Sequence, residues 1–190
     1  QFLRPTKAKA FVTAHERAVA RGADVLAPDH MLARLRAMPR YTVPLVQSHD
    51  DLNIRNVFAC ASRAEVVLID FTRSIERPLS KDVARLDVGL AFDCALDPEQ
   101  QLPANVLKDY YTGDLFAISL RHAVMGAVAR YKLEAIHSLR KQILCDAQRF
   151  EYDPSVEYTV AVISELLYHA DTGDNDLAYE CASRLTAEVA

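Results

Sequence analysis

Apolar residues recur every three or four positions over most of this chain, which is the spacing of one buried helix face. The first such segment begins at Thr6, a residue type that caps helices, and ends at Gly22. Further helices are predicted over residues 29–38, 80–97 and 114–143 and from Asp153 and Asp174 onward, with a shorter helix or a turn-rich connection over residues 98–113. The pattern therefore predicts a mainly helical protein.

Residues 44–71 depart from this periodicity. Their pattern predicts a strand, a polar loop, a second strand, a short turn and a third strand, and polar residues then predict a loop as far as Pro78. At 190 residues and 21.2 kDa the chain is long enough for one domain and too short to expect two. The predicted fold class is mainly α (α+β), a helical bundle with a small β-hairpin element. The single domain, residues 1–190, divides into helices over 1–40, a polar loop with short strands over 41–71, and a helical subdomain over 80–190.

Composition excludes some classes of protein. A net charge of −4 argues against a dedicated nucleic-acid binder, and a mildly acidic balance would suit a cationic ligand. No apolar run approaches the length of about 18 residues that a membrane span requires. The four cysteines lack metal-binding spacing, so we expect reduced, mostly buried thiols in a cytoplasmic protein: Cys60, Cys94, Cys145 and Cys181.

The polar loop and the strand after it carry residues that phosphoryl transfer requires. His49, Asp51 and Asn56 occur as His-x-Asp-Leu-x-x-x-Asn, and an apolar strand then leads to Asp70. Phosphoryl transfer needs an oriented nucleophile and oxygen ligands for Mg²⁺, which usually takes only one or two ligands from the protein. Asn56 and Asp70 fit as those ligands, and the Asp51 carboxylate would accept a hydrogen bond from an incoming hydroxyl. His49 is expected to hydrogen-bond to backbone near Asp70 and to maintain the loop.

These motifs resemble the catalytic lobe of the protein-kinase-like superfamily, most closely its aminoglycoside and choline phosphotransferase branch. That branch has His-Gly-Asp-Leu-His-x-x-Asn and then a strand ending in Ile-Asp-Phe, which are similar to residues 49–56 and 69–71 here. Residues 81–86, Lys-Asp-Val-Ala-Arg-Leu, are similar to the Asp-Leu-Ala segment of the branch. The segments Leu-Ile-Asp-Phe-Thr-Arg and Asp-Val-Ala-Arg-Leu-Asp are also similar to a bacterial group described as ternary-complex-associated, phosphotransferase-like domains.

The resemblance implies a kinase-like C-terminal lobe that uses ATP and Mg²⁺ to phosphorylate a hydroxyl of a small molecule. It implies that Asp51 is the catalytic base, that Asn56 and Asp70 hold the nucleotide-bound metal, and that Asp82 braces the catalytic loop from behind. The alternative for Asp82 is simpler, because a carboxylate in the first turn of a helix complements the helix dipole.

The chain also departs from the family pattern. Asp50 replaces the usual Gly, Thr72 takes the third position of the kinase Asp-Phe-Gly motif, and Asn53 replaces the catalytic-loop Lys of Ser/Thr kinases. Thr72 and Asn53 argue against a protein kinase proper, whereas Asp50 places a second carboxylate beside the proposed base. Only 48 residues precede His49, they have a helical pattern, and no Gly-x-Gly-x-x-Gly occurs. We therefore expect that the N-terminal nucleotide lobe is missing and that the chain, which begins at Gln1, is a segment of a longer protein.

Three hypotheses follow from the sequence. In the first, the chain is part of an enzyme whose remaining domains or partner supply the nucleotide lobe. In the second, it is a catalytically inactive, kinase-like interaction module within a larger bacterial signalling or defence protein. In the third, the motif matches are accidental and the protein is an unrelated helical one.

Overall fold

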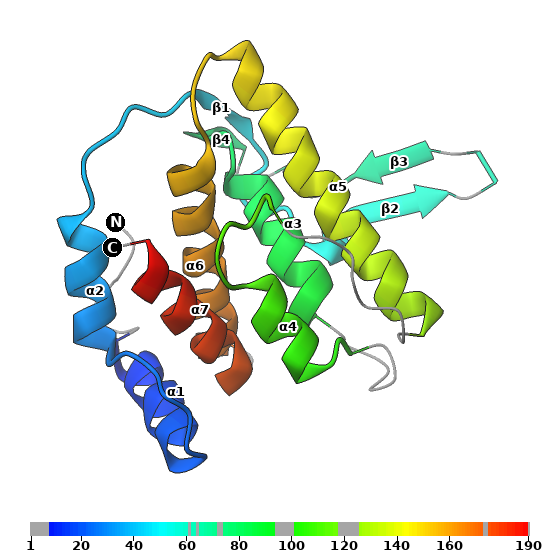
Figure 1. Ribbon diagram of the computed structural model, residues 1–190. Helices are drawn as coiled ribbons and strands as arrows, with labels where there is room; N and C mark the ends of the chain where they lie inside the picture. The colour runs from blue at the N-terminus through cyan, green and yellow to red at the C-terminus, as the bar shows by residue number, and fades with distance from the viewer. Residues whose placement is uncertain are drawn as a thin grey trace.

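The computed structural model describes residues 8–60, 62–63, 65–71, 74–93, 101–117, 126–172 and 175–189. Within these ranges the chain forms seven α-helices and four short strands (Figure 1). The helices are α1 (Ala8–Ala20), α2 (Pro28–Ala37), α3 (Lys81–Phe92), α4 (Ala104–Tyr110), α5 (Ala127–Arg149), α6 (Ser155–Thr172) and α7 (Asp176–Glu188). The strands are β1 (Leu45–Ser48), β2 (Val57–Cys60), β3 (Glu65–Leu68) and β4 (Ile75–Pro78), and a 3-10 turn, η2 (Ile54–Asn56), precedes β2. The predicted mainly helical fold with a small β element is confirmed.

The hydrophobic core forms where α6 packs against both α7 and α3 (Figure 1). Helix α3 also packs against α5, and α1 lies against α6 and α7. Fully buried side chains from the three C-terminal helices share one apolar cluster, among them Leu133, Ile136, Ile163, Leu166 and Leu185. Burial of an aliphatic side chain of this size stabilises a protein by about 1.5–3 kcal/mol. The helices thus hold one another in place through a common core.

A buried ion pair joins α3 to α5 inside this core. Asp87 is 0% exposed and Arg140 is 2% exposed, and Arg140 Nε donates to Asp87 Oδ2 at 2.6 Å. The hydroxyl groups of Tyr111 and Tyr158 each donate to the same carboxylate at 2.6 Å, and Arg140 Nη1 donates to the Leu115 carbonyl at 3.0 Å. Burial raises the pKa of both tyrosines well above 10, so both remain hydrogen-bond donors. The buried charges are therefore paired and hydrogen-bonded, as burial requires.

The four strands form two separate two-stranded antiparallel sheets. Strand β2 pairs with β3 from Val57↔Leu68 to Cys60↔Glu65, which confirms the two antiparallel strands predicted on either side of the turn. Strand β1 pairs with β4, with Ser48 opposite Ile75. The loop predicted up to Pro78 is wrong, because residues 75–78 are a strand. An antiparallel strand at the surface needs no continuous apolar run. Because β4 contains the polar residues Glu76 and Arg77, its sequence resembles that of a loop.

The long helix predicted from Asp114 is wrong at its start. Asp114 Oδ1 accepts a hydrogen bond from the Phe116 backbone, which forms a local turn instead of a helix. Helix α5 begins at Ala127 with Gly126 at its N-cap, and residues 118–125 lie outside the described residues. The helical spacing of apolar residues over 114–143 also predicts Val128 and Tyr131 on the buried face, but both side chains are exposed. Helix α3 ends at Phe92, five residues before the predicted end at residue 97, and residues 94–97 are outside the described ranges.

Three of the four cysteines fall within the described residues, and all three are free thiols. Cys181 is buried, but Cys145 is exposed, so the expectation of mostly buried thiols is wrong for Cys145. Cys94 lies outside the described ranges. In the part of the chain that the structure describes, no helix combines the length and apolar character needed to cross a membrane.

Candidate active site

The loop that follows β1 is held at its start by the side chain of Asp82. Asp82 Oδ2 accepts a hydrogen bond from the backbone N–H of His49 at 2.6 Å, and Oδ1 accepts one from Asp50 at 3.1 Å. Hydrogen bonds to an ionised acceptor are stronger than those between neutral groups. Asp82 lies in the first turn of α3, where the helix dipole also favours a carboxylate. The contacts expected of a brace are present, and dipole complementation applies at the same position.

His49 connects this loop to the end of β3. Its side chain is buried, and Nε2 donates to the carbonyl oxygen of Ile69 at 2.6 Å. That carbonyl belongs to the peptide bond leading into Asp70, so the hydrogen bond predicted from the sequence is present. The His49 ring also packs on Phe71, with ring centroids 4.7 Å apart. Nδ1 of His49 is buried and has no hydrogen-bond partner among the described residues.

Asn56 lies beside the same strand end. Its backbone carbonyl accepts a hydrogen bond from the Ile69 N–H at 3.0 Å, which places it next to the segment that carries Asp70. Its side-chain Nδ2 donates to the backbone carbonyl of Asp51 at 2.9 Å. Asp70 has φ of 63°, in the left-handed region that aspartate adopts more readily than most residues, so the chain turns sharply after β3. The structure thus joins the segments that carry Asp51, Asn56 and Asp70.

The carboxylate of Asp51 pairs with Arg85 on α3. Arg85 Nη2 donates to Asp51 Oδ1 at 2.5 Å, and Arg85 Nη1 lies 3.4 Å from Glu165 Oε2 on α6. Lys81, one helical turn before Arg85, also forms an ion pair with Glu165, and the Arg85 guanidinium lies 5.0 Å from the centre of the Tyr168 ring. Sequence reasoning missed this chain of charges. The Lys-x-x-x-Arg spacing indicates that Lys81 and Arg85 share one helix face, because residues four apart are neighbours on a helix, but it does not indicate their partners.

Asp50 occupies the position where the family pattern has Gly. Its φ is 61°, in the left-handed region, which explains why glycine suits this position. The Asp50 carboxylate accepts two hydrogen bonds from Arg77 on β4, at 2.7 and 3.0 Å. The adjacent carboxylates of Asp50 and Asp51 are therefore held by two different guanidinium groups, and each has a counter-charge of its own.

Asn56 and Asp70 offer the oxygen donors that Mg²⁺ prefers. Since Asn56 Nδ2 is engaged by the Asp51 carbonyl, the amide oxygen Oδ1 is the atom left to face a metal. Among the described residues, no group of three or more His, Cys, Asp or Glu side chains is placed to hold a metal ion. A pair of ligands made of the Asn56 amide and the Asp70 carboxylate contains only one residue of these four types, so it would not form such a group. This donor set fits Mg²⁺, which completes its coordination with water and phosphate.

Comparison of the chain with protein-family models, with curated proteins and with solved structures found no match. The kinase-like interpretation therefore depends on the motifs and on the hydrogen bonds that join them, and it stays a prediction.

Proposed function

We propose that this chain is the catalytic lobe of an ATP- and Mg²⁺-dependent phosphotransferase that acts on a hydroxyl of a small molecule. The observation that carries the proposal is the hydrogen-bonded unit of Asp82, His49 and Asn56, which joins the segments of Asp51 and Asp70. In-line phosphoryl transfer requires a base and metal ligands on adjoining, rigid segments. The arrangement supports a phosphotransferase better than any other chemistry that these side chains offer.

In this proposal Asp51 receives the proton of the acceptor hydroxyl. The hydroxyl oxygen forms a bond to the γ-phosphorus of ATP while the bond to the bridging oxygen breaks, and ADP leaves. Arg85 fixes the orientation of the Asp51 carboxylate through Oδ1, and within the described residues Oδ2 has no hydrogen-bond partner. Asn56 and Asp70 would hold Mg²⁺, which when bound neutralises charge on the phosphates. His49 and Asp82 are positioning residues.

The exposed surface of the β2–β3 hairpin supports a missing nucleotide lobe. The hairpin projects from the helical body (Figure 1). Val57 on it is half-buried, whereas six large apolar side chains on it and just after it are at least 38% exposed: Phe58, Val66, Val67, Leu68, Ile69 and Phe71. Soluble proteins rarely leave an apolar patch of this kind uncovered. The patch adjoins Asp70, so a nucleotide-binding lobe from a larger protein or a partner would cover it and place ATP beside the metal ligands.

The proposal is tested by measuring Mg²⁺-dependent ATP binding and phosphoryl transfer by this chain and by a longer protein that supplies a nucleotide lobe. Asp51→Asn should lower transfer by a factor of about 10²–10⁴ and leave nucleotide affinity nearly unchanged. Asp70→Asn should weaken Mg²⁺-dependent nucleotide binding. Asp146→Asn is the matched control, because this carboxylate lies on α5 near Arg149 and away from the loop. Undiminished transfer by Asp51→Asn would refute the role of Asp51.

The second candidate is an inactive, kinase-like interaction module. Two observations favour it: Arg85 already engages the Asp51 carboxylate at 2.5 Å, and residues 8–37 form α1 and α2 instead of a nucleotide-binding hairpin. In that case the hydrogen-bonded unit has only a structural function and the exposed hairpin is a docking surface. Absence of ATP binding by both the chain and the longer protein would favour the module over the enzyme.

A further inference from the structure

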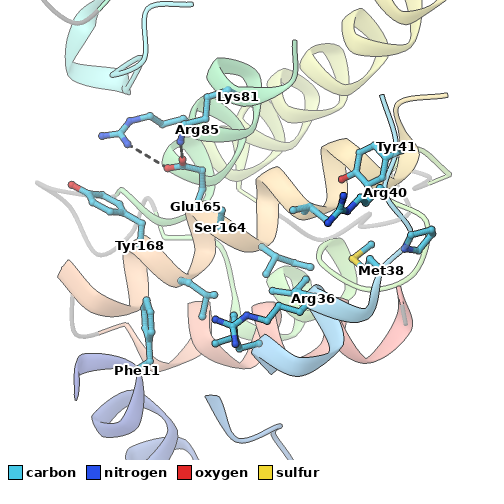
Figure 2. A pocket seen from close by; sticks show the side chains of 16 residues that line it. Phe11, Arg36, Met38, Arg40, Tyr41, Lys81, Arg85, Ser164, Glu165 and Tyr168 are labelled. Atoms are coloured by element: carbon cyan, nitrogen blue, oxygen red, sulfur yellow. Dashed lines mark hydrogen bonds and ion pairs between the residues drawn. The ribbon is translucent and has the colours of Figure 1, made fainter. Parts of the chain in front are cut away.

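A cavity of about 730 Å³ lies between α2 with the segment after it and α6 with the start of α3 (Figure 2). This volume is in the range of about 300–1,000 Å³ that is usual for small-molecule sites. Leu35 and Met38 line it on the side of α2, and Ile163 and Leu167 line it on α6. The cavity therefore offers an apolar surface to a bound molecule.

Positive charge dominates the polar part of the lining. Arg36 and Arg40 lie on the side of α2, and Lys81 and Arg85 lie on α3 (Figure 2). Among the described residues that line the cavity, Glu165 is the one carboxylate, and Lys81 and Arg85 already contact it. Arg36 and Arg40 have no ion-pair or hydrogen-bond partner among the described residues. Arg85 is also paired with Asp51, so these four cations face two carboxylates among the described residues. The excess is two positive charges, those of Arg36 and Arg40, and charge complementarity then favours an anionic ligand.

The Arg85 side chain connects the cavity to the proposed base. Arg85 lines the cavity and also donates to Asp51 Oδ1 at 2.5 Å. A molecule that fills the cavity as far as Arg85 would bring one end close to Asp51, while its other end would lie near Arg36 and Arg40.

We propose that this cavity binds a small molecule that carries a carboxylate or phosphate group on an apolar body, and that this molecule is the acceptor of the transferred phosphoryl group. Arg36 and Arg40 bind the anionic group, the apolar lining binds the body, and the acceptor hydroxyl lies at the Arg85 end. The binding of the anion follows from the cavity alone, whereas its part as acceptor rests on the proposed function. The cavity lining is positively charged, although the chain as a whole is acidic. The lining therefore favours an anionic acceptor over a cationic one such as an aminoglycoside or choline.

The test is calorimetric titration of this chain, without nucleotide or Mg²⁺, with three probes that share a six-carbon body: hexyl phosphate, 1-hexanol and hexyltrimethylammonium. Hexyl phosphate should bind about tenfold or more tightly than either of the others, because only it complements the arginines. The double variant Arg36→Gln/Arg40→Gln should weaken the binding of hexyl phosphate by about tenfold, because it removes both positive charges that contact the phosphate. Both side chains are exposed, so the substitutions should leave the hydrophobic core intact. Arg149→Gln is the matched control, as this exposed arginine on α5 is outside the lining.

The location is checked by amide NMR spectra of the labelled protein, in which hexyl phosphate should shift the signals of Arg40, Arg85 and Asp51. Equal affinity for the cationic probe, no measurable heat with hexyl phosphate, or unchanged binding by the double variant would each overturn the inference. Binding as expected with no phosphoryl transfer in the longer protein would refute the proposed function and leave the anion site intact. Phosphoryl transfer to cationic acceptors, with no binding of hexyl phosphate, would refute the anion site and support the proposed function.

Discussion

Replacing Asp87 with Asn is expected to lower the free energy of unfolding by about 3–5 kcal/mol, because it leaves the buried Arg140 charge without a counter-charge. Asp87 is 0% exposed, and its two oxygens accept hydrogen bonds from both tyrosine hydroxyls and from Arg140. Asn supplies one acceptor oxygen and places an NH₂ donor against these donors. Domains are stable by only about 5–15 kcal/mol in total, so the predicted loss is a large part of the stability.

The assay is urea denaturation followed by circular dichroism. With a slope of about 2 kcal/mol per M, the loss corresponds to a decrease of about 1.5–2.5 M in the midpoint. Glu134→Gln provides a matched control, since its partner Arg130 is 3.8 Å away, both side chains are exposed and the pair lies on the same helix as Arg140. Glu134→Gln should lower the free energy of unfolding by no more than about 0.5 kcal/mol, because exposed ion pairs contribute little to stability.

The reasoning is checked further by combining Asp87→Asn with Arg140→Met. The two changes should be non-additive by about 1 kcal/mol or more, because the second removes the charge that the first leaves unpaired. A midpoint for Asp87→Asn within about 0.3 M of the Glu134→Gln control, or strict additivity in the double variant, would refute the argument.

Two further predictions concern the loop and the pH dependence of stability. Asp82→Ala should lower the free energy of unfolding by about 1–3 kcal/mol in the urea assay, because it leaves the His49 amide unpaired and the Asp50 amide with Ser48 Oγ as its remaining acceptor. Asp82→Asn should lower it less, and a loss below about 0.5 kcal/mol for Asp82→Ala would contradict the brace. Burial raises the pKa of Glu157 above its usual 4.5, despite hydrogen bonds from Ser80 and Tyr152, so the folded state binds this proton more tightly than the unfolded state. The stability that this proton contributes is present below pH 4.5 and is lost as pH rises through the pKa of Glu157 in the folded state. Over this pH range Glu157→Gln should therefore gain stability relative to the original chain. A difference in the free energy of unfolding that does not depend on pH would contradict this prediction.

Helical periodicity predicted α1, α2, α3, α6 and α7 because each buries one face against a neighbour. It failed at Asp114, where apolar residues keep a helical spacing but the Asp114 side chain bonds to the local backbone and forms a turn. The sequence pattern also missed β4, whose residues do not by themselves favour a strand. Strand β4 is stabilised by its hydrogen bonds to β1. Local patterns report a buried face well, but they do not report a partner that lies elsewhere in the chain.

The same limit applied to the candidate site. The hydrogen bond of His49 to backbone near Asp70 was predicted from the order of residues in the loop and strand. The contact of Asp82 with the loop was expected from the resemblance alone, because Asp82 is 33 positions from His49, and the hydrogen bond from the Asn56 side chain to the Asp51 carbonyl was not predicted. The pairing of Arg85 with Glu165 joins residues 80 positions apart, and no local spacing encodes it. The cavity likewise requires α2 to lie opposite α6, an arrangement that becomes visible only when the helices are packed.

Helix α3 carries both the loop contact of Asp82 and the buried carboxylate of Asp87 within six consecutive residues. At a rise of 1.5 Å per residue these two anchors are about 7.5 Å apart along the helix axis. Any small rotation or translation of α3 would therefore displace the loop that follows β1 together with Arg85. Core substitutions that loosen this one helix should distort the loop before the protein unfolds, so the geometry of the site is a sensitive reporter of interior packing.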